Sequence, residues 1–236
     1  MAELKLASTI MLGRDHNNTL EVLLVKRNKS LAFAGGLWVF PGGKIEEEEV
    51  LRGKDELDAA KIAAVRETKE EADLDINADQ LIFFRHWTTP VNEPRRYATY
   101  FFFGACQALA SNVQVDDSEI IAYQWVTPQL ALQQFADKKI AMMPPTILSL
   151  QLISKCRSTK EASLLLSAAT PVFVLPVIHY LGGKVFCLYE GDAGYGTGDA
   201  TIVGARHRLV LDMTTGEYKF EFEDCVDILP VDGGGH

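Results

Sequence analysis

The 236-residue sequence predicts an α/β protein, of the α+β kind, with a β-rich C-terminal extension. Two observations support this fold class. Strand-like and helix-like segments are mixed up to about residue 157, whereas the segments after Ser158 are strand-like and separated by hairpin turns. No internal repeat with the period of a solenoid is present. We therefore expect an α/β domain over residues 1–157 and a β-rich extension over residues 158–236.

Composition excludes several classes of protein. The chain has 47% hydrophobic residues and a net charge of −9, which is ordinary for a soluble globular protein. A protein that grips the backbone of DNA or RNA needs clustered Lys and Arg, so nucleic acid is not an expected partner. No apolar run of about 18 residues suggests a membrane span, and the N-terminus lacks the apolar segment of a signal peptide. The four cysteines form no metal-like or disulfide-like pattern, and we expect a cytoplasmic protein.

The N-terminal half begins with strands. Residues 9–12 and 20–25 are expected to be strands on either side of a polar turn over residues 13–18. A short apolar strand over residues 37–40 should end at Pro41-Gly42-Gly43. Further strands, rich in aromatic and β-branched residues, are expected over residues 81–84, 97–105 and 120–126.

Helices are expected at three places in this half. One should start at Asp55 or Asp58, either of which can cap a helix, and end near Ala72. Thr127 can cap a second helix over about residues 128–136, with Pro128 in its first turn. Pro144-Pro145 can open a third, to about residue 155.

The extension has two hairpin signals. Strands over residues 172–177 and 185–189 flank a turn at Gly182-Gly183, and strands over 208–212 and 217–222 flank a turn that ends at Gly216. The glycine-rich run at 191–198 lacks the Gly-Lys-Ser/Thr of a phosphate-binding loop. The hairpins could cover the first sheet, form a homodimer interface or shape a substrate pocket, and the sequence leaves these three open.

The helix expected near residue 70 carries the most informative residues. Glu67, Glu70 and Glu71 are spaced i, i+3 and i+4, so their carboxylates share one face and repel each other. A divalent cation relieves such repulsion, and oxygen-only ligands suit Mg²⁺ or Mn²⁺. Arg66 can offset part of the charge as a forked donor. The alternative is a solvated charged face, and only the residues upstream favour the metal site.

The upstream residues complete a recognisable motif. The segment from Gly43 to Leu74 resembles the Nudix box, G-x5-E-x7-R-E-U-x-E-E-x-G-U with U apolar. It departs at the spacer, which has 16 residues instead of seven, and at Thr68 and Asp73. Asp73 replaces a glycine that would end the helix in a left-handed conformation, which Asp adopts at modest cost. The long spacer leaves the position of Glu49 relative to the helix unfixed. The matching residues are Gly43, Glu49, Arg66, Glu67, Glu70 and Glu71.

The resemblance implies a fold and a chemistry. The Nudix fold is an α/β/α sandwich on a mixed sheet, and its usual activity is hydrolysis of a nucleoside diphosphate linked to another moiety. By position, Glu67, Glu70, Glu71 and the Gly43 carbonyl would be metal ligands, with Arg66 among the catalytic residues. Cations neutralise the phosphate oxygens and lower the pKa of the attacking water. A carboxylate must then accept the water's proton, and both Glu70 and Glu119 remain candidates.

A second stretch, residues 23–43, resembles the motif of the coenzyme A diphosphatase branch, and residues 87–102 resemble a stretch in acyl-CoA diphosphatases. This resemblance implies phosphate contacts from Arg27, Arg95, Arg96 and Gly42. Consecutive residues on a strand point to opposite faces, so at most one of Arg95 and Arg96 can face a given site.

Other functions remain open. One alternative is a Nudix-like module that binds a nucleotide without cleaving it. Another is a hydrolase of ADP-ribose, a dinucleotide or an oxidised nucleoside triphosphate. Residues 43–76 and 160–236 each carry a charge of −6, so the remainder is mildly basic at +3, which suits a small anionic substrate.

Overall fold

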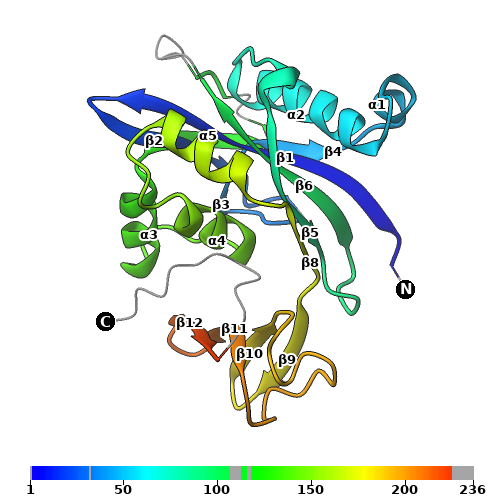
Figure 1. Cartoon of the computed structure of the whole chain (residues 1–236), viewed down its shortest axis with the longest axis vertical. Helices are drawn as coiled ribbons and strands as arrows, with labels where there is room; N and C mark the ends of the chain where they lie inside the picture. Colours follow the sequence, from blue (N-terminus) through cyan, green and yellow to red (C-terminus); the bar gives the residue numbers. More distant parts are fainter. Residues whose placement is uncertain (1, 32, 107–112, 116–117, 225–236) are drawn as a thin grey trace.

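The computed structural model describes residues 2–31, 33–106, 113–115 and 118–224. It contains two sheets (Figure 1). The larger is an eight-stranded mixed sheet in which β3-β2-β1-β6-β5-β8 are consecutive neighbours, while β4 pairs with β1 and β7 pairs with β2. The smaller has four strands in the order β12-β11-β10-β9. The α/β fold with a second β-rich part is thereby confirmed.

A long hairpin forms the centre of the larger sheet. β1 spans Leu4–His16 and β2 spans Thr19–Arg27. β1 runs through residues 13–16 of the segment that was predicted to be a polar turn, so that prediction was wrong for most of residues 13–18. The turn is confined to Asn17 and Asn18, whose φ angles of 49° and 58° lie in the left-handed region that asparagine tolerates. Polar residues such as Arg14 and Glu21 instead pair across the strands at 2.7 Å.

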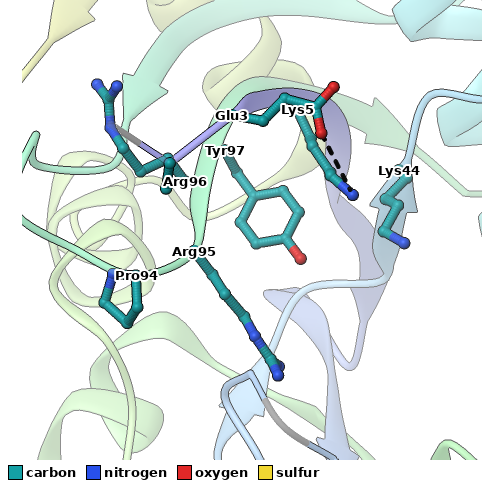
Figure 2. Close-up of a pocket in the computed structure, with 8 residues that line it drawn as sticks. Glu3, Lys5, Lys44, Pro94, Arg95, Arg96 and Tyr97 are labelled. Carbon is teal, nitrogen blue, oxygen red and sulfur yellow. Dashed lines mark ion pairs between the residues drawn. The ribbon is translucent and has the colours of Figure 1, made fainter.

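Strands from distant parts of the chain meet at the N-terminal end of β1. β4 (Gly42–Lys44) is antiparallel to β1, and β6 (Arg96–Ala105) is parallel to it. Lys5, Lys44 and Tyr97 project from these three strands (Figure 2). The sheet is completed by short β3 (Trp38–Val39) and by two longer strands, β5 (Ile82–Thr88) and β7 (Ile120–Val126).

Helices cover both faces of this sheet (Figure 1). α2 (Glu56–Ala72) packs on one face, where Ser8 on β1 donates a hydrogen bond of 2.7 Å to the carbonyl of Ala60. α3 (Pro128–Ala136), α4 (Pro144–Leu152) and α5 (Thr159–Ala168) lie on the other. Each face therefore has its own apolar core: Ile10 and Leu12 pack with α2, and Met11 packs with the helices opposite. The predicted caps at Thr127 and Pro128 are confirmed.

Two helices were not expected from the sequence. α1 (Glu47–Arg52) contains Glu49 and the first residues of the lengthened spacer. α5 follows Ser158, which caps it by accepting a hydrogen bond from the Glu161 N–H. Beyond α5, β8 (Val172–Val174) pairs with β5. The elements after residue 157 thus begin with a helix and a strand of the larger sheet. The division of the chain at 157/158 stays a prediction.

The smaller sheet consists of two hairpins. β9 (Val177–Leu181) and β10 (Lys184–Leu188) are joined at Gly182-Gly183, and β11 (Arg206–Asp212) and β12 (Tyr218–Glu223) are joined by a turn that includes Gly216. Both hairpins had been predicted, although the strand expected over 172–177 is divided between β8 and β9. In the described ranges, no helix combines the length and the apolar character that a bilayer crossing requires.

Candidate active site

The acidic face of α2 is held in place by the two ends of the helix and by its alanines. Asp55 caps the N-terminus by accepting a hydrogen bond from the Asp58 N–H at 2.8 Å. Asp73 ends the helix with a φ of 53°, which confirms that Asp takes the left-handed position expected for glycine. The buried Ala60 and Ala64 let the helix approach the sheet closely. Glu67 and Glu71 consequently meet β4 and its neighbours.

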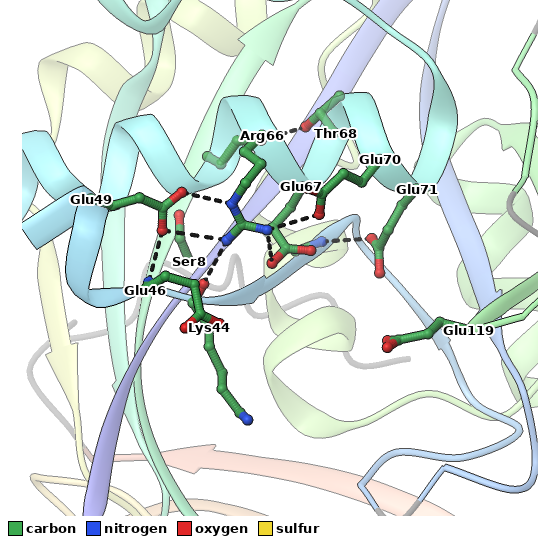
Figure 3. A network of polar contacts seen from close by, with 12 residues as sticks. Ser8, Lys44, Glu46, Glu49, Arg66, Glu67, Thr68, Glu70, Glu71 and Glu119 are labelled. Carbon is green, nitrogen blue, oxygen red and sulfur yellow. Dashed lines mark hydrogen bonds and ion pairs between the residues drawn. The ribbon is translucent and has the colours of Figure 1, made fainter.

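Arg66 is the centre of a polar network on this face (Figure 3). Its Nε donates to Glu49 Oε1, and its Nη1 donates to Glu67 Oε1 and Glu70 Oε2, all at 2.8 Å. Its Nη2 donates to the Lys44 carbonyl at 3.0 Å. The hydrogen bond to Glu49 raises the pKa of Arg66 above its usual range, so the guanidinium is permanently charged. Arg66 therefore ties helix α2 to both α1 and β4.

Glu49 belongs to this network in spite of the long spacer. It is buried, and its Oε2 accepts a hydrogen bond of 2.8 Å from the Glu46 N–H within α1. The spacer completes α1 and forms the turn after it, which returns the chain to the start of α2. The insertion thus leaves Glu49 in contact with Arg66. The sequence had not placed Glu49 in the site.

Gly43 lies against Glu67. A Cβ atom at Gly43 would be 2.2 Å from Glu67 Oε1, well inside van der Waals contact. The β4 backbone and the Glu67 carboxylate are therefore in direct contact. With the carboxylate in this position, only glycine fits at residue 43. The preceding residue, Gly42, has a φ of 156° and donates its N–H to Glu71 Oε2 at 2.9 Å. The Pro-Gly-Gly segment therefore positions two of the three helix carboxylates.

Glu71 is the most buried of the three carboxylates. Burial raises its pKa to about 8, and the negative charge of Glu67 adds to the shift, although the Gly42 hydrogen bond and Arg27 act in the opposite direction. Arg27 Nη1 lies 3.8 Å from Glu71, and Arg27 Nη2 lies 3.7 Å from Glu119. Burial also raises the pKa of Glu67. A nearby cation would favour the ionised form of both carboxylates.

The donor chemistry fits Mg²⁺ or Mn²⁺. Glu67, Glu70, Glu71 and the Gly43 carbonyl offer only oxygen, which these hard cations prefer. A divalent ion would also offset the repulsion between the half-buried Glu67 and the buried Glu71. Within the described ranges, no three Asp, Glu, His or Cys side chains converge as a preformed metal cage. The carboxylates of Glu67 and Glu70 instead face the Arg66 guanidinium.

Arg95 and Arg96, which were both expected to bind substrate, lie in different environments. Arg96 is buried, and its Nε donates to the Thr89 carbonyl at 3.3 Å. The Arg95 side chain leaves the chain in the other direction and lines a cavity of about 460 Å³ (Figure 2). Lys5 and Lys44 line the same cavity, although neither was a predicted site residue. Lys5 lies in the mildly basic remainder of the chain, whereas Lys44 lies inside the acidic block over residues 43–76, so no sequence signal pointed to Lys44.

Comparison with known proteins identifies the family. The model of the NUDIX domain matches residues 5–144. The chain belongs to the NUDIX domain family. The Nudix box of this chain is therefore formed by the β4 glycines, α1 and α2, with a spacer that begins in α1 and ends in α2.

Curated relatives carry Nudix names. Putative nudix hydrolase 7 of Caenorhabditis elegans is 27% identical over 59% of this chain and 57% of its own length. Nudix hydrolase 8 of Arabidopsis thaliana is 32% identical over 47% of this chain and 27% of its own length. This Nudix chain thus spans between about a quarter and somewhat over half of the length of these relatives.

Solved structures share the fold. A NUDIX hydrolase from Alicyclobacillus acidocaldarius matches with a TM-score of 0.62 and 24% identity, over 72% of this chain and all of that one. The NUDIX domain of Shewanella oneidensis NrtR, in complex with ADP ribose, matches with a TM-score of 0.50 and 18% identity, over 70% of this chain and 90% of that one. At these identities the likeness concerns the Nudix fold alone.

Proposed function

We propose that this protein is a metal-dependent pyrophosphohydrolase that cleaves a nucleoside diphosphate linked to another moiety. The observation that carries the proposal is the contact of three helix carboxylates with Arg66 and the Gly42-Gly43 backbone. A phosphoanhydride carries negative oxygens that repel an attacking nucleophile. A site that combines carboxylates for a cation with arginines for phosphate suits this reaction.

The metal would be Mg²⁺ or Mn²⁺, held by Glu67, Glu70, Glu71 and the Gly43 carbonyl. When bound, it supplies charge neutralisation and a lowered pKa for water. Arg66 positions Glu67 and Glu70 through its Nη1. Arg27, which lies between Glu71 and Glu119, is the arginine best placed to contact a phosphate beside these carboxylates.

The general base would be Glu70 or Glu119. Both side chains are more than half exposed, so either can meet a water molecule. Glu70 lies 2.8 Å from Arg66, and this ion pair occupies one of its carboxylate oxygens. Glu119 lies 3.7 Å from Arg27, a longer and weaker pair. The amide variants Glu70→Gln and Glu119→Gln distinguish the two carboxylates.

The substrate class favoured by the sequence is coenzyme A or an acyl-CoA, through the motif over residues 23–43 and the arginines at 27 and 95. The rival is a Nudix-like module that binds a nucleotide without turnover. One observation favours this rival: Arg66 already pairs with Glu67 and Glu70, the carboxylates that a metal would need.

A hydrolysis screen tests the proposal. Purified protein with Mn²⁺ or Mg²⁺ would be incubated with CoA, ADP-ribose, a dinucleoside polyphosphate and an oxidised nucleoside triphosphate, and products identified by chromatography and mass spectrometry. We expect a nucleoside monophosphate product that disappears with a chelator. Glu71→Gln should lower the rate at least about 100-fold, whereas Glu48→Gln, at an exposed position of α1, should not. Ligand binding without turnover on the whole panel would favour the rival.

A further inference from the structure

The segment that carries Glu119 is joined to the end of β2 by Asn28. The Asn28 N–H donates a hydrogen bond of 2.7 Å to the Glu119 carbonyl, and the Asn28 side chain donates through Nδ2 to the Ser118 carbonyl at 3.0 Å. Asn28 directly follows Arg27, whose guanidinium lies 3.7 Å from the Glu119 carboxylate and 3.8 Å from that of Glu71. One residue beside Arg27 therefore holds two adjacent carbonyls of the Glu119 segment.

An irregularity in the β2–β7 pairing brings Asn28 opposite Glu119. The register shifts by one residue just before Arg27, because Ile121 is an extra residue in β7. Bulges of this kind redirect the chain that follows them and are common beside active sites. In an unbroken ladder Glu119 would be opposite Lys29, about 3.3 Å farther along β2. The bulge thus moves Glu119 one position closer to Arg27.

Local hydrogen bonds hold the Asn28 side chain in its orientation. Its Oδ1 accepts the Ser30 N–H at 3.1 Å and the Ser30 hydroxyl at 3.0 Å. The hydrogen bond from the Ser30 N–H forms a turn that asparagine and aspartate can both make. Donation to the Ser118 carbonyl requires the amide, because an ionised carboxylate has no hydrogen to donate. Asparagine therefore makes both contacts, whereas aspartate would make only the turn.

The position of Glu119 matters for the chemistry proposed for the site. Its side chain is 59% exposed, and its ion pair with Arg27 is long, at 3.7 Å. Figure 3 shows the Glu119 and Glu71 carboxylates in the same region of the site. A displacement of about 1 Å in a reacting group can cost about 100-fold in rate. The two hydrogen bonds from Asn28 constrain the backbone of this segment more closely than the ion pair constrains the side chain.

We propose that Asn28 is a positioning residue that sets the place of Glu119 relative to Arg27 and Glu71. The inference rests on the proposed function, in which Glu119 is a candidate for the general base. Asn28 contacts neither the substrate nor the attacking water. It acts on turnover through the backbone of Ser118 and Glu119.

The first test compares Asn28→Asp with Asn77→Asp in steady-state kinetics of the full chain. Asn28→Asp keeps the turn with Ser30 and removes the donor to Ser118. Asn77 is exposed and accepts a hydrogen bond from the N–H two residues on, so Asn77→Asp is a matched change outside the site. We expect Asn28→Asp to lower kcat at least about tenfold with KM within about threefold, and Asn77→Asp to change neither. Asn28→Ala, which adds no charge, should lower kcat as much.

A double variant tests whether Asn28 acts through Glu119. In the Glu119→Gln background, Asn28→Asp should change kcat by less than about twofold, because two residues that act as a unit are not additive. A similar tenfold loss in both backgrounds would overturn the inference. A kcat for Asn28→Asp within about twofold of the wild-type value would also overturn it.

Hydrogen–deuterium exchange keeps this inference separate from the proposed function. The amide of residue 28, which donates to the Glu119 carbonyl, should exchange at least about tenfold faster in Asn28→Asp than in the wild type, after correction for intrinsic rates. Unchanged exchange would overturn the inference whether or not the protein hydrolyses a nucleotide. Faster exchange in a protein without turnover would contradict the proposed function and still support Asn28 as the residue that fixes Glu119.

Discussion

Arg66 and Glu49 are in contact at 2.8 Å, although they are 17 positions apart in the sequence. The contact depends on α1, because the Glu46–Glu49 capping box fixes the orientation of the Glu49 carboxylate. Glu49 in turn accepts two hydrogen bonds from the guanidinium, the second at 3.3 Å from Nη2. Glu49 is thus a positioning residue: it acts on Glu67 and Glu70 through Arg66.

We predict that Glu49→Gln lowers kcat by at least about tenfold with a smaller change in KM. The amide keeps the size of the side chain but removes the charge that holds Arg66, so Arg66 can reorient toward Glu67 and Glu70. Loss of this charged hydrogen bond should also cost about 1–3 kcal/mol of the free energy of unfolding. Steady-state kinetics and chemical denaturation measure the two effects. Equal kinetics for Glu49→Gln and the exposed Glu48→Gln would contradict this role.

A second prediction concerns Gly43. Gly43→Ala should reduce activity about 100-fold or more, because the added Cβ would meet Glu67 Oε1 at 2.2 Å and displace the carboxylate or the strand. Gly196→Ala is the matched control, since a Cβ there meets no atom within 4 Å and its φ is not positive. Wild-type activity in Gly43→Ala would show that β4 can move without harm to the site.

Local chemistry made much of the fold predictable from sequence. Asp55, Thr127 and Pro128 mark helix starts because capping is a property of a few adjacent residues. The left-handed conformation of Asp73 was predictable for the same reason. The turn at residues 13–18 was misjudged because its polar side chains pair across the hairpin, as Arg14 and Glu21 do, and pairing of that kind depends on strand register.

The parts that could not be predicted depend on long-range contacts. α1 has only six residues, which is too short to show helical periodicity in the sequence. It is held in place by its contacts with α2. The position of Glu49 follows from that packing. The cavity requires the β1–β6 pairing, which joins Lys5 to Tyr97 across 92 positions. The sequence could place Arg95 and Arg96 on opposite faces, but it could not show that Lys5 and Lys44 share the face of Arg95.

A third prediction distinguishes the two candidate bases. The group that accepts the proton should, when replaced by its amide, lower kcat by about 100-fold or more and abolish the acidic limb of the pH–rate profile. Because Glu70 is paired with Arg66 at 2.8 Å, we expect Glu119→Gln to have this effect. Glu70→Gln should instead raise the metal concentration needed for half-maximal rate. Acidic limbs that persist in Glu119→Gln and vanish in Glu70→Gln would reverse the assignment.

The smaller sheet has an ionic centre of its own. Arg208 on β11 donates to both carboxylate oxygens of Asp192, through Nε at 2.6 Å and Nη2 at 2.5 Å. Asp192 also accepts the N–H groups of His207 and Gly194, so it joins the glycine-rich loop to the sheet. Burial favours the neutral acid, but these hydrogen bonds outweigh it and lower the pKa of Asp192.

This lowered pKa predicts how stability depends on pH. The carboxylate is favoured in the folded state, so its contribution is complete well above the unfolded value of about 3.9 and is lost as the pH falls through the folded pKa. Asp192→Asn leaves Arg208 buried without its partner and should cost about 3–5 kcal/mol at pH 7. The variant should also lose less stability than the wild type between about pH 5 and pH 3. Denaturant unfolding across this range, with the exposed Glu217→Gln as control, measures both effects; equal stabilities at pH 7 would show that the pair contributes no net stability.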